Sequence, residues 1–187
     1  MGAIRFEDLD ASISVAPEGR YWVLTCLQTV PTPVEELFPF FADAYNLEEI
    51  TPGMLNFEVL TPKPIDMKAG ALIDYRLRVR GVPIRWKTEI AVWDPPRRFV
   101  DQQLKGPYER WHHTHTFEPT PEGGTLCTDR VEYRPIGGPL ASIANALFVQ
   151  RDVMGIFKHR TIKIAERFGV PGRELQREER EVSRSVL

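Results

Sequence analysis

The stretch "PLASIANALFVQRDVMGIFKHRTIKIAERF" (139–168) decides the fold of this chain. After Pro139 it contains one helix breaker, Gly155, and the pair Gly169 and Pro171 that follows it is typical of a helix stop. We predict a single helix of about 30 residues, roughly 40 Å long at about 1.5 Å per residue. Its apolar residues recur at the helical period and lie close to one face: Ile143, Leu147, Met154, Phe157, Ile164, Ala165 and Phe168.

Strand candidates separated by turn signals precede this helix, over residues 56–61, 71–80, 82–93, 99–105, 110–118 and 125–133. The breaks between them, such as Gly106-Pro107, are too short for crossover helices, so consecutive strands should pair antiparallel. One more strand is predicted at "YWVLTCLQTV" (21–30), followed by two short helices over 34–41 and 44–50. The chain therefore predicts a seven-stranded sheet and one long helix.

The composition is that of an ordinary globular protein, with 187 residues of which 42% are hydrophobic and 27% charged. We expect one domain over residues 1–170, with its core in 21–168. Residues 171–187 alternate in charge and have few apolar anchors, which predicts a disordered tail. The net charge of -2, with both signs interleaved, argues against a nucleic acid partner.

No window has the roughly 20 apolar residues of a membrane span. Residues 1–19 carry charges where a secretory signal needs an apolar run, so we expect a cytoplasmic protein. Cys26 and Cys127 lie far apart within strand-like segments, which predicts buried free thiols rather than a redox pair. The sequence does not indicate an oligomeric state.

Alternation along the strands indicates which side chains point inward, because successive residues of a strand face opposite sides. In "RWHHTHTFEP" (110–119), Trp111 and Phe117 mark the inner face, so His113 and His115 point inward and His112 points outward. In residues 82–93 the inward set is predicted to be Val82, Ile84, Trp86, Thr88, Ile90 and Val92.

The order of elements resembles the helix-grip fold of the START and pollen-allergen-like superfamily, also called SRPBCC or polyketide cyclase-like. The resemblance covers about residues 21–168. The segments "NLEEITPGMLNFEVLTPKPIDMKAGALIDYRLRVRGVPIRWKTEI", "WDPPRRFVDQQLKGPYERWHHTHTFEP" and "TDRVEYRP" are similar to bacterial ligand-binding members of this family. The resemblance implies an α+β fold in which a curved seven-stranded antiparallel sheet wraps around the long helix. It also implies a cavity between them, where members bind lipids, sterols, polyketides or other apolar molecules and some act as cyclases or hydratases.

The two inward histidines have three interpretations. They can be polar groups that line the cavity and orient a ligand, hydrogen-bonded to Gln103, Asp129 or Tyr75. One of them can act as a general base with Asp129 or Asp101 as its partner. A shared metal would need a third ligand, for which Asp101, Gln103, Asp129 and His159 are candidates without a recognisable spacing. We predict no metal and no cofactor, since the sequence has no nucleotide-binding motif and no nucleophile motif.

Three functions are consistent with these residues. The first is binding of a small apolar or amphipathic molecule. The second is a cyclase or dehydratase that uses His113 or His115 with Asp129. The third is a protein-interaction module whose core is filled by aromatic side chains. The residues predicted to contact a ligand are Tyr75, Trp86, Asp101, Gln103, Tyr108, Trp111, Phe117, Met154 and Phe157.

Overall fold

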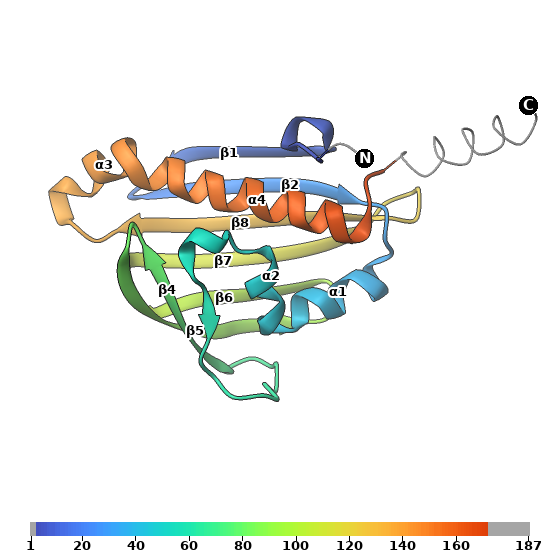
Figure 1. Ribbon diagram of the computed structural model, residues 1–187, viewed down its shortest axis with the longest axis horizontal. Coiled ribbons are helices and arrows are strands. Elements are labelled where there is room, and N and C mark those ends of the chain that lie inside the picture. Colours follow the sequence, from blue (N-terminus) through green and yellow to red (C-terminus); the bar gives the residue numbers. More distant parts are fainter. Residues whose placement is uncertain (1–2, 172–187) are drawn as a thin grey trace, which may run out of the picture.

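The computed structural model describes residues 3–171, which form one antiparallel sheet and the helices that cover its inner face. The sheet has eight strands in the order β1-β2-β8-β7-β6-β5-β4-β3 (Figure 1). Every neighbouring pair is antiparallel, as the short breaks in the sequence predict. The strands are β1 (Ala11–Glu18), β2 (Tyr21–Val30), β3 (Glu58–Val59), β4 (Leu72–Val79), β5 (Val82–Asp94), β6 (Arg98–Lys105), β7 (Tyr108–Pro119) and β8 (Thr125–Pro135).

The prediction of seven strands was wrong by one, because β1 had not been recognised. Its sequence, "ASISVAPE", offers only Ile13 and Val15 as large apolar residues, and Pro17 argues against a central strand. β1 nevertheless pairs with β2 along its whole length, and Ile13 and Val15 pack against the core. It is an edge strand, where a proline is tolerated because no further strand needs its N–H.

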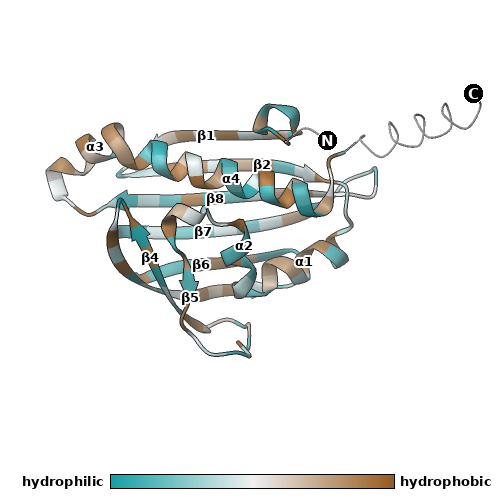
Figure 2. Cartoon of the chain, in the orientation of Figure 1, coloured by the Kyte–Doolittle hydropathy of each residue, from teal (hydrophilic) through white to brown (hydrophobic). Residues whose placement is uncertain are grey.

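The long C-terminal helix is confirmed as a continuous run of helical turns over residues 141–168. It consists of α3 (Ala141–Ala144), a π-helical turn (Asn145–Val149) and α4 (Gln150–Phe168). The predicted apolar face holds for Phe157, Ile164 and Ala165, which are buried. It fails for Ile143 and Leu147, which are 56% and 61% exposed, because the wider π turn rotates the apolar stripe. In Figure 2 the turns around α3, at one end of the molecule, are coloured mostly as hydrophobic.

The two predicted short helices are α1 (Val34–Ala42) and α2 (Leu47–Ile50), with a 3-10 turn (Ala44–Asn46) between them. In Figure 1, α4 runs along the β1, β2 and β8 side of the sheet, whereas α1 and α2 lie beside the strands from β5 to β7. None of the helices in residues 3–171 is long and apolar enough to cross a membrane.

A β-bulge corrects one of the predicted strand faces. The pairing of β5 with β6 shifts between Ile90 and Val92, so the alternation inverts after Ile90. Trp93, predicted to point outward, consequently packs on the inner side against Phe38, with ring centroids 5.5 Å apart. Thr88 and Ile90, which precede the bulge, are buried as predicted.

The core consists of three clusters. The first lies beneath α1 and includes Leu37, Phe38 and Phe117. The second lies between α4 and β2 and β8, and includes Leu24, Val131 and Phe157. The third lies on β4 and β5 around Ile73, Tyr75 and Ile90. Cys26 and Cys127 are both buried and free, as predicted. The predicted tail at 171–187 lies, apart from residue 171, outside the described residues.

Candidate ligand-binding site

The inner face of β4 to β7 bounds a cavity of about 850 Å³, which lies between the sheet, α4 and the segment from α1 to β3. Its walls are mainly apolar and aromatic, with a few polar and charged side chains among them. A concave apolar space of this size with few polar groups is typical of a small-molecule site.

Most of the residues predicted for the site do line this cavity: Tyr75, Trp86, Asp101, Tyr108, Trp111, His113, His115 and Phe157. Trp86 and Trp111 meet edge to face with ring centroids 5.3 Å apart, and Tyr108 packs against both. Trp86 Nε1 donates a hydrogen bond to the buried hydroxyl of Thr88 at 3.0 Å, which fixes the indole against β5. These three rings form an aromatic wall at the end of the cavity near the β6–β7 turn.

Four predicted residues lie outside the cavity lining, each for a local reason. Phe117 packs edge to face against Phe38, 5.4 Å away, because α1 covers this part of the sheet. Met154 packs against the cluster between α4 and β2. The Gln103 amide donates to the Tyr108 carbonyl at 2.7 Å and so closes the β6–β7 turn. Asp129 lies beside the histidines, with a side chain that is 13% exposed, and it does not line the cavity.

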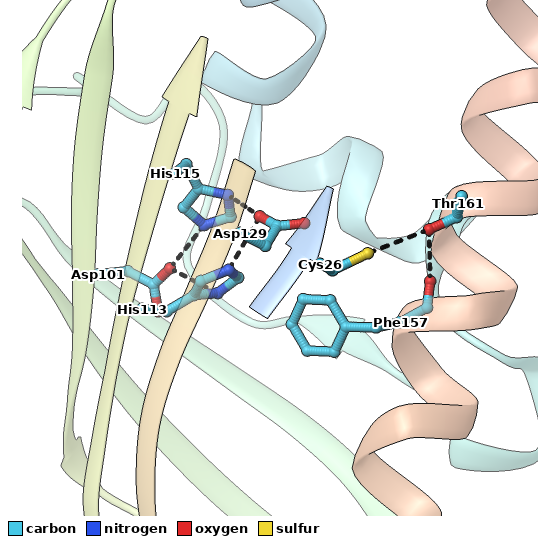
Figure 3. Close-up of polar contacts among 7 residues, drawn as sticks. All are labelled: Cys26, Asp101, His113, His115, Asp129, Phe157 and Thr161. Carbon is cyan, nitrogen blue, oxygen red and sulfur yellow. Dashed lines mark hydrogen bonds and ion pairs between the residues drawn. The ribbon is translucent and has the colours of Figure 1, made fainter. Parts of the chain in front are cut away.

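His113 and His115 form a four-residue cluster with Asp101 and Asp129, which we call the His–Asp cluster (Figure 3). His113 Nε2 lies 3.0 Å from Asp129 Oδ1, and His115 Nε2 lies 3.0 Å from Asp101 Oδ2. The other ring nitrogens cross over, with His115 Nδ1 2.8 Å from Asp129 and His113 Nδ1 3.4 Å from Asp101. The two rings are 3.7 Å apart, and both side chains are almost fully buried.

Of the groups predicted to hold the histidines, the structure brings Asp129 and Asp101 to them. Both imidazoles contact these two aspartates, whereas neither hydrogen-bonds to Gln103 or Tyr75. The reason is strand register, since β7 places His113 opposite Asp101 of β6 and His115 opposite Asp129 of β8. Each carboxylate therefore lies within reach of both rings.

Burial and charge act in opposite directions on this cluster. Burial alone would raise the pKa of both carboxyl groups, but the adjacent imidazoles hold the pKa of Asp101 and of Asp129 below the usual range. Desolvation and the nearby His115 lower the pKa of His113 to about 4. Burial would also lower the pKa of His115, but its contacts with both carboxylates raise it instead. The two imidazoles are thus shifted in opposite directions, so His115 keeps its proton to a higher pH than His113 does.

The same cluster has the donor set of a metal site. Asp101, His113 and His115 each offer one ligand atom, and these atoms lie within 4.8 Å of one another. Imidazole and carboxylate ligands suit divalent zinc, iron or manganese. At present these atoms contact one another, so a metal would have to replace those contacts. His159, a predicted alternative ligand, lies on the cavity lining but outside this group.

Arg160 of α4 is a cavity residue that the sequence interpretation missed. It is only 9% exposed, and its guanidinium lies 4.8 Å from the centre of the Phe157 ring. One signal for it was available in the sequence. Arg160 stands three residues after Phe157 and four before Ile164, which is the spacing of the buried face of a helix.

Comparison with known proteins identifies a family to which the chain belongs. Residues 30–160 match the family model described as "Polyketide cyclase / dehydrase and lipid transport". No curated protein matches the chain.

Several solved structures share the fold. Protein Ms6760 from Mycobacterium smegmatis is 22% identical, with a TM-score of 0.55 over 82% of this chain and 93% of that one. Protein CV1439 from Chromobacterium violaceum is 14% identical, with a TM-score of 0.61 over 78% and 96%. The major latex-like protein 151 from Panax ginseng is 13% identical, with a TM-score of 0.59 over 80% and 99%. At these identities the likeness concerns the fold alone.

Proposed function

Because this chain belongs to the polyketide cyclase / dehydrase and lipid transport family, we propose that it binds a small hydrophobic or amphipathic molecule between the sheet and α4. The observation that carries the proposal is the cavity of about 850 Å³. Its volume falls within the range of roughly 300–1,000 Å³ that is usual for ligand pockets.

The cavity walls support an apolar ligand with a small polar part. Ile73, Leu77 and Ile90 offer aliphatic surface, and burying apolar ligand area against such walls contributes about 25 cal/mol per Å². Trp86 and Trp111 add flat surfaces at one end. Polar and charged side chains are fewer than apolar ones in the lining, and they include Arg78, Arg151 and Asp152 as well as Asp101, the two histidines and Arg160. We expect them to orient a ligand within mainly apolar walls.

The alternative of a filled core loses its basis. It required the aromatic side chains to occupy the space between sheet and helix. Trp86, Trp111 and Phe157 instead stand in the walls of a cavity, and Phe117 packs beneath α1. An interaction module with a solid interior is therefore not proposed.

An acid–base enzyme is the second candidate, favoured by the exposure of His113, His115 and Asp101 to the cavity. The pKa of His113 is lowered and that of His115 is raised, so the pair offers a weaker and a stronger base for proton transfer in one place. Such a pair suits proton abstraction next to a carbonyl, as in cyclisation or dehydration. Replacing His115 by Ala should then abolish turnover of a bound carbonyl compound while its affinity changes little. Equal loss of both would contradict a purely catalytic role.

Native mass spectrometry of the freshly purified protein tests the ligand proposal. We expect an added organic mass that leaves on denaturation. A Leu77→Trp variant should lose that mass, because Leu77 is buried on the cavity lining and the larger indole would occupy cavity volume. Arg76→Trp, on the same strand outside the lining, is the matched control and should retain the ligand. Loss in both variants, or in neither, would contradict binding in this cavity.

A further inference from the structure

Arg160 is a buried cation without a hydrogen-bonding partner among residues 3–171. Its Nε and Nη1 are fully enclosed, and their N–H groups donate to no acceptor in that part of the chain. No carboxylate oxygen of those residues lies within 4.0 Å of the guanidinium. Arg167, two turns further along α4, instead binds Glu49 at 3.0 Å on the surface. The difference matters because a buried charge without hydrogen bonds is costly, whereas an exposed arginine can be solvated by water.

The surroundings of Arg160 show why the protein does not supply an acceptor. Its guanidinium rests on the ring of Phe157, whose edge faces His113 with centroids 5.4 Å apart. The positive charge is near enough to lower the pKa of Asp101, yet the oxygens of Asp101 contact the two histidines. Long-range attraction to the His–Asp cluster therefore offsets part of the charge without satisfying the N–H groups.

A second donor stands nearby on the sheet. The Tyr75 side chain is buried and lines the cavity, and its hydroxyl has no hydrogen bond within the described part of the chain. Arg160 also influences the pKa of Tyr75, so the two groups belong to the same part of the cavity. A guanidinium and a phenol are both donors, and together they call for an acceptor that carries negative charge.

We propose that the cavity ligand is an apolar carboxylic acid whose carboxylate binds Arg160, with its hydrocarbon part against the aliphatic and aromatic walls. This inference rests on the proposed function and specifies its ligand class. The carboxylate supplies an acceptor to Nη2, the guanidinium nitrogen that is not fully enclosed, and its charge offsets that of the whole guanidinium. The apolar wall residues exclude water from the pair. Such an acid has the amphipathic form that the lining requires, since its charge is confined to one end.

Binding of dodecanoate and of 1-dodecanol, measured by titration calorimetry at pH 7.5, tests the proposal. The two probes share a chain and differ in the head group. We expect wild-type protein to bind dodecanoate on the order of tenfold more tightly than dodecanol, as for a hydrogen bond to a charged group. Arg160→Met should remove this preference while the affinity for dodecanol stays similar. Arg167→Met, which removes the same charge outside the cavity, should keep it.

The outcomes separate this inference from the proposed function. Equal binding of the two probes by wild type, or an Arg160→Met variant that still prefers dodecanoate, would overturn the role of Arg160 and leave the cavity as a binding site. Failure of both probes to bind would count against the proposed function itself. Thermal unfolding adds an independent readout, because removing an unpaired buried charge should leave Tm unchanged or raise it. A marked fall in Tm for Arg160→Met, but not for Arg167→Met, would mean that Arg160 has a structural partner, and would overturn the proposal.

Discussion

The two ends of the sheet's inner face use the same kind of side chain in opposite ways. Beneath α1, the rings of Trp93 and Phe117 pack against Phe38 of that helix. Towards β4 and β5, Tyr75 and Trp86 line an open volume of about 850 Å³. We call these the packed end and the cavity end. Inward-facing aromatic residues of a strand therefore fill the interior only where a helix comes down onto them.

We expect the largest difference in stability between the packed end and the cavity end when one phenylalanine is truncated at each. Phe117→Ala at the packed end removes a side chain that is 2% exposed, and should lower the free energy of unfolding by about 3–5 kcal/mol. Phe57→Ala at the cavity end removes a half-buried ring beside Tyr75, and should cost about 1–2 kcal/mol. Urea unfolding of both variants measures the difference. Equal losses would mean that the cavity end is packed as tightly as the other.

The His–Asp cluster lies at the boundary between the packed end and the cavity end. Replacing Asp129 measures how much this cluster contributes to the stability of the protein. Asp129→Asn removes a buried charge that both histidines contact, and should cost about 3 kcal/mol. Asp74→Asn is the matched control, because its pair with Lys87 is largely exposed and should contribute less than about 1 kcal/mol. Chemical denaturation of the two variants provides the comparison. A small effect for Asp129 would show that the histidines do not depend on it.

The cluster should also make stability depend on pH in two opposite directions. The pKa of His113 is lowered in the folded state to about 4, so the unfolded chain binds its proton first as pH falls below about 6.5. Stability should therefore fall between about pH 6.5 and 4. The pKa of His115 is raised, so its contribution is fully present below about pH 6.5 and is lost as pH rises through the folded value.

Thermal unfolding of the wild type between about pH 4 and 9 should accordingly give a maximum of Tm near pH 6.5. His113→Gln should flatten the acid side of the curve, and His115→Gln should flatten the alkaline side. His112→Gln, on the outer face of the same strand, is the control and should keep both. A wild-type curve that rises steadily from acid to neutral and stays level above would contradict the role assigned to His115.

A larger side chain should not destabilise the protein at the cavity end, but it should do so where α4 packs closely against the sheet. Gly155→Ala places a methyl group where no atom lies within 4 Å, and removes a helix glycine, so it should stabilise the protein by up to about 1 kcal/mol. Ala165→Val enlarges a residue that is buried against the sheet, and should cost about 1 kcal/mol or more. Thermal unfolding distinguishes the two. If Gly155→Ala destabilised the protein, another side chain would have to lie in contact with this position.

The sequence was informative where local patterns fix the structure. The long apolar period predicted the C-terminal helix, and closely spaced turns predicted the antiparallel order. Alternation along β7 placed His113 and His115 inward, and both are buried. Two local irregularities defeated the same reasoning: the bulge after Ile90 turned Trp93 inward, and the π turn moved Ile143 and Leu147 to the surface. Neither irregularity can be recognised from the regular spacing of apolar residues in the sequence.

The candidate site was harder to predict because it depends on distances between elements. Alternation gave the inward faces of Tyr75 and Trp86, but the space before them depends on where α1 and α4 sit. The pairing of His113 and His115 with two aspartates required the register of three strands. Arg160 has the spacing of the buried helix face, but only tertiary packing shows that its charge is enclosed.

The position of β1 has a consequence for how the protein behaves among its own copies. β1 ends the sheet on one side, so its outer backbone groups are not used by a neighbouring strand. Exposed edges of this kind promote strand addition and aggregation. This edge carries Ser12, Ser14, Pro17 and Glu18, a set with low β-propensity that includes one residue without an N–H donor. The features that made β1 hard to recognise as a strand are therefore also features that disfavour strand addition at this edge.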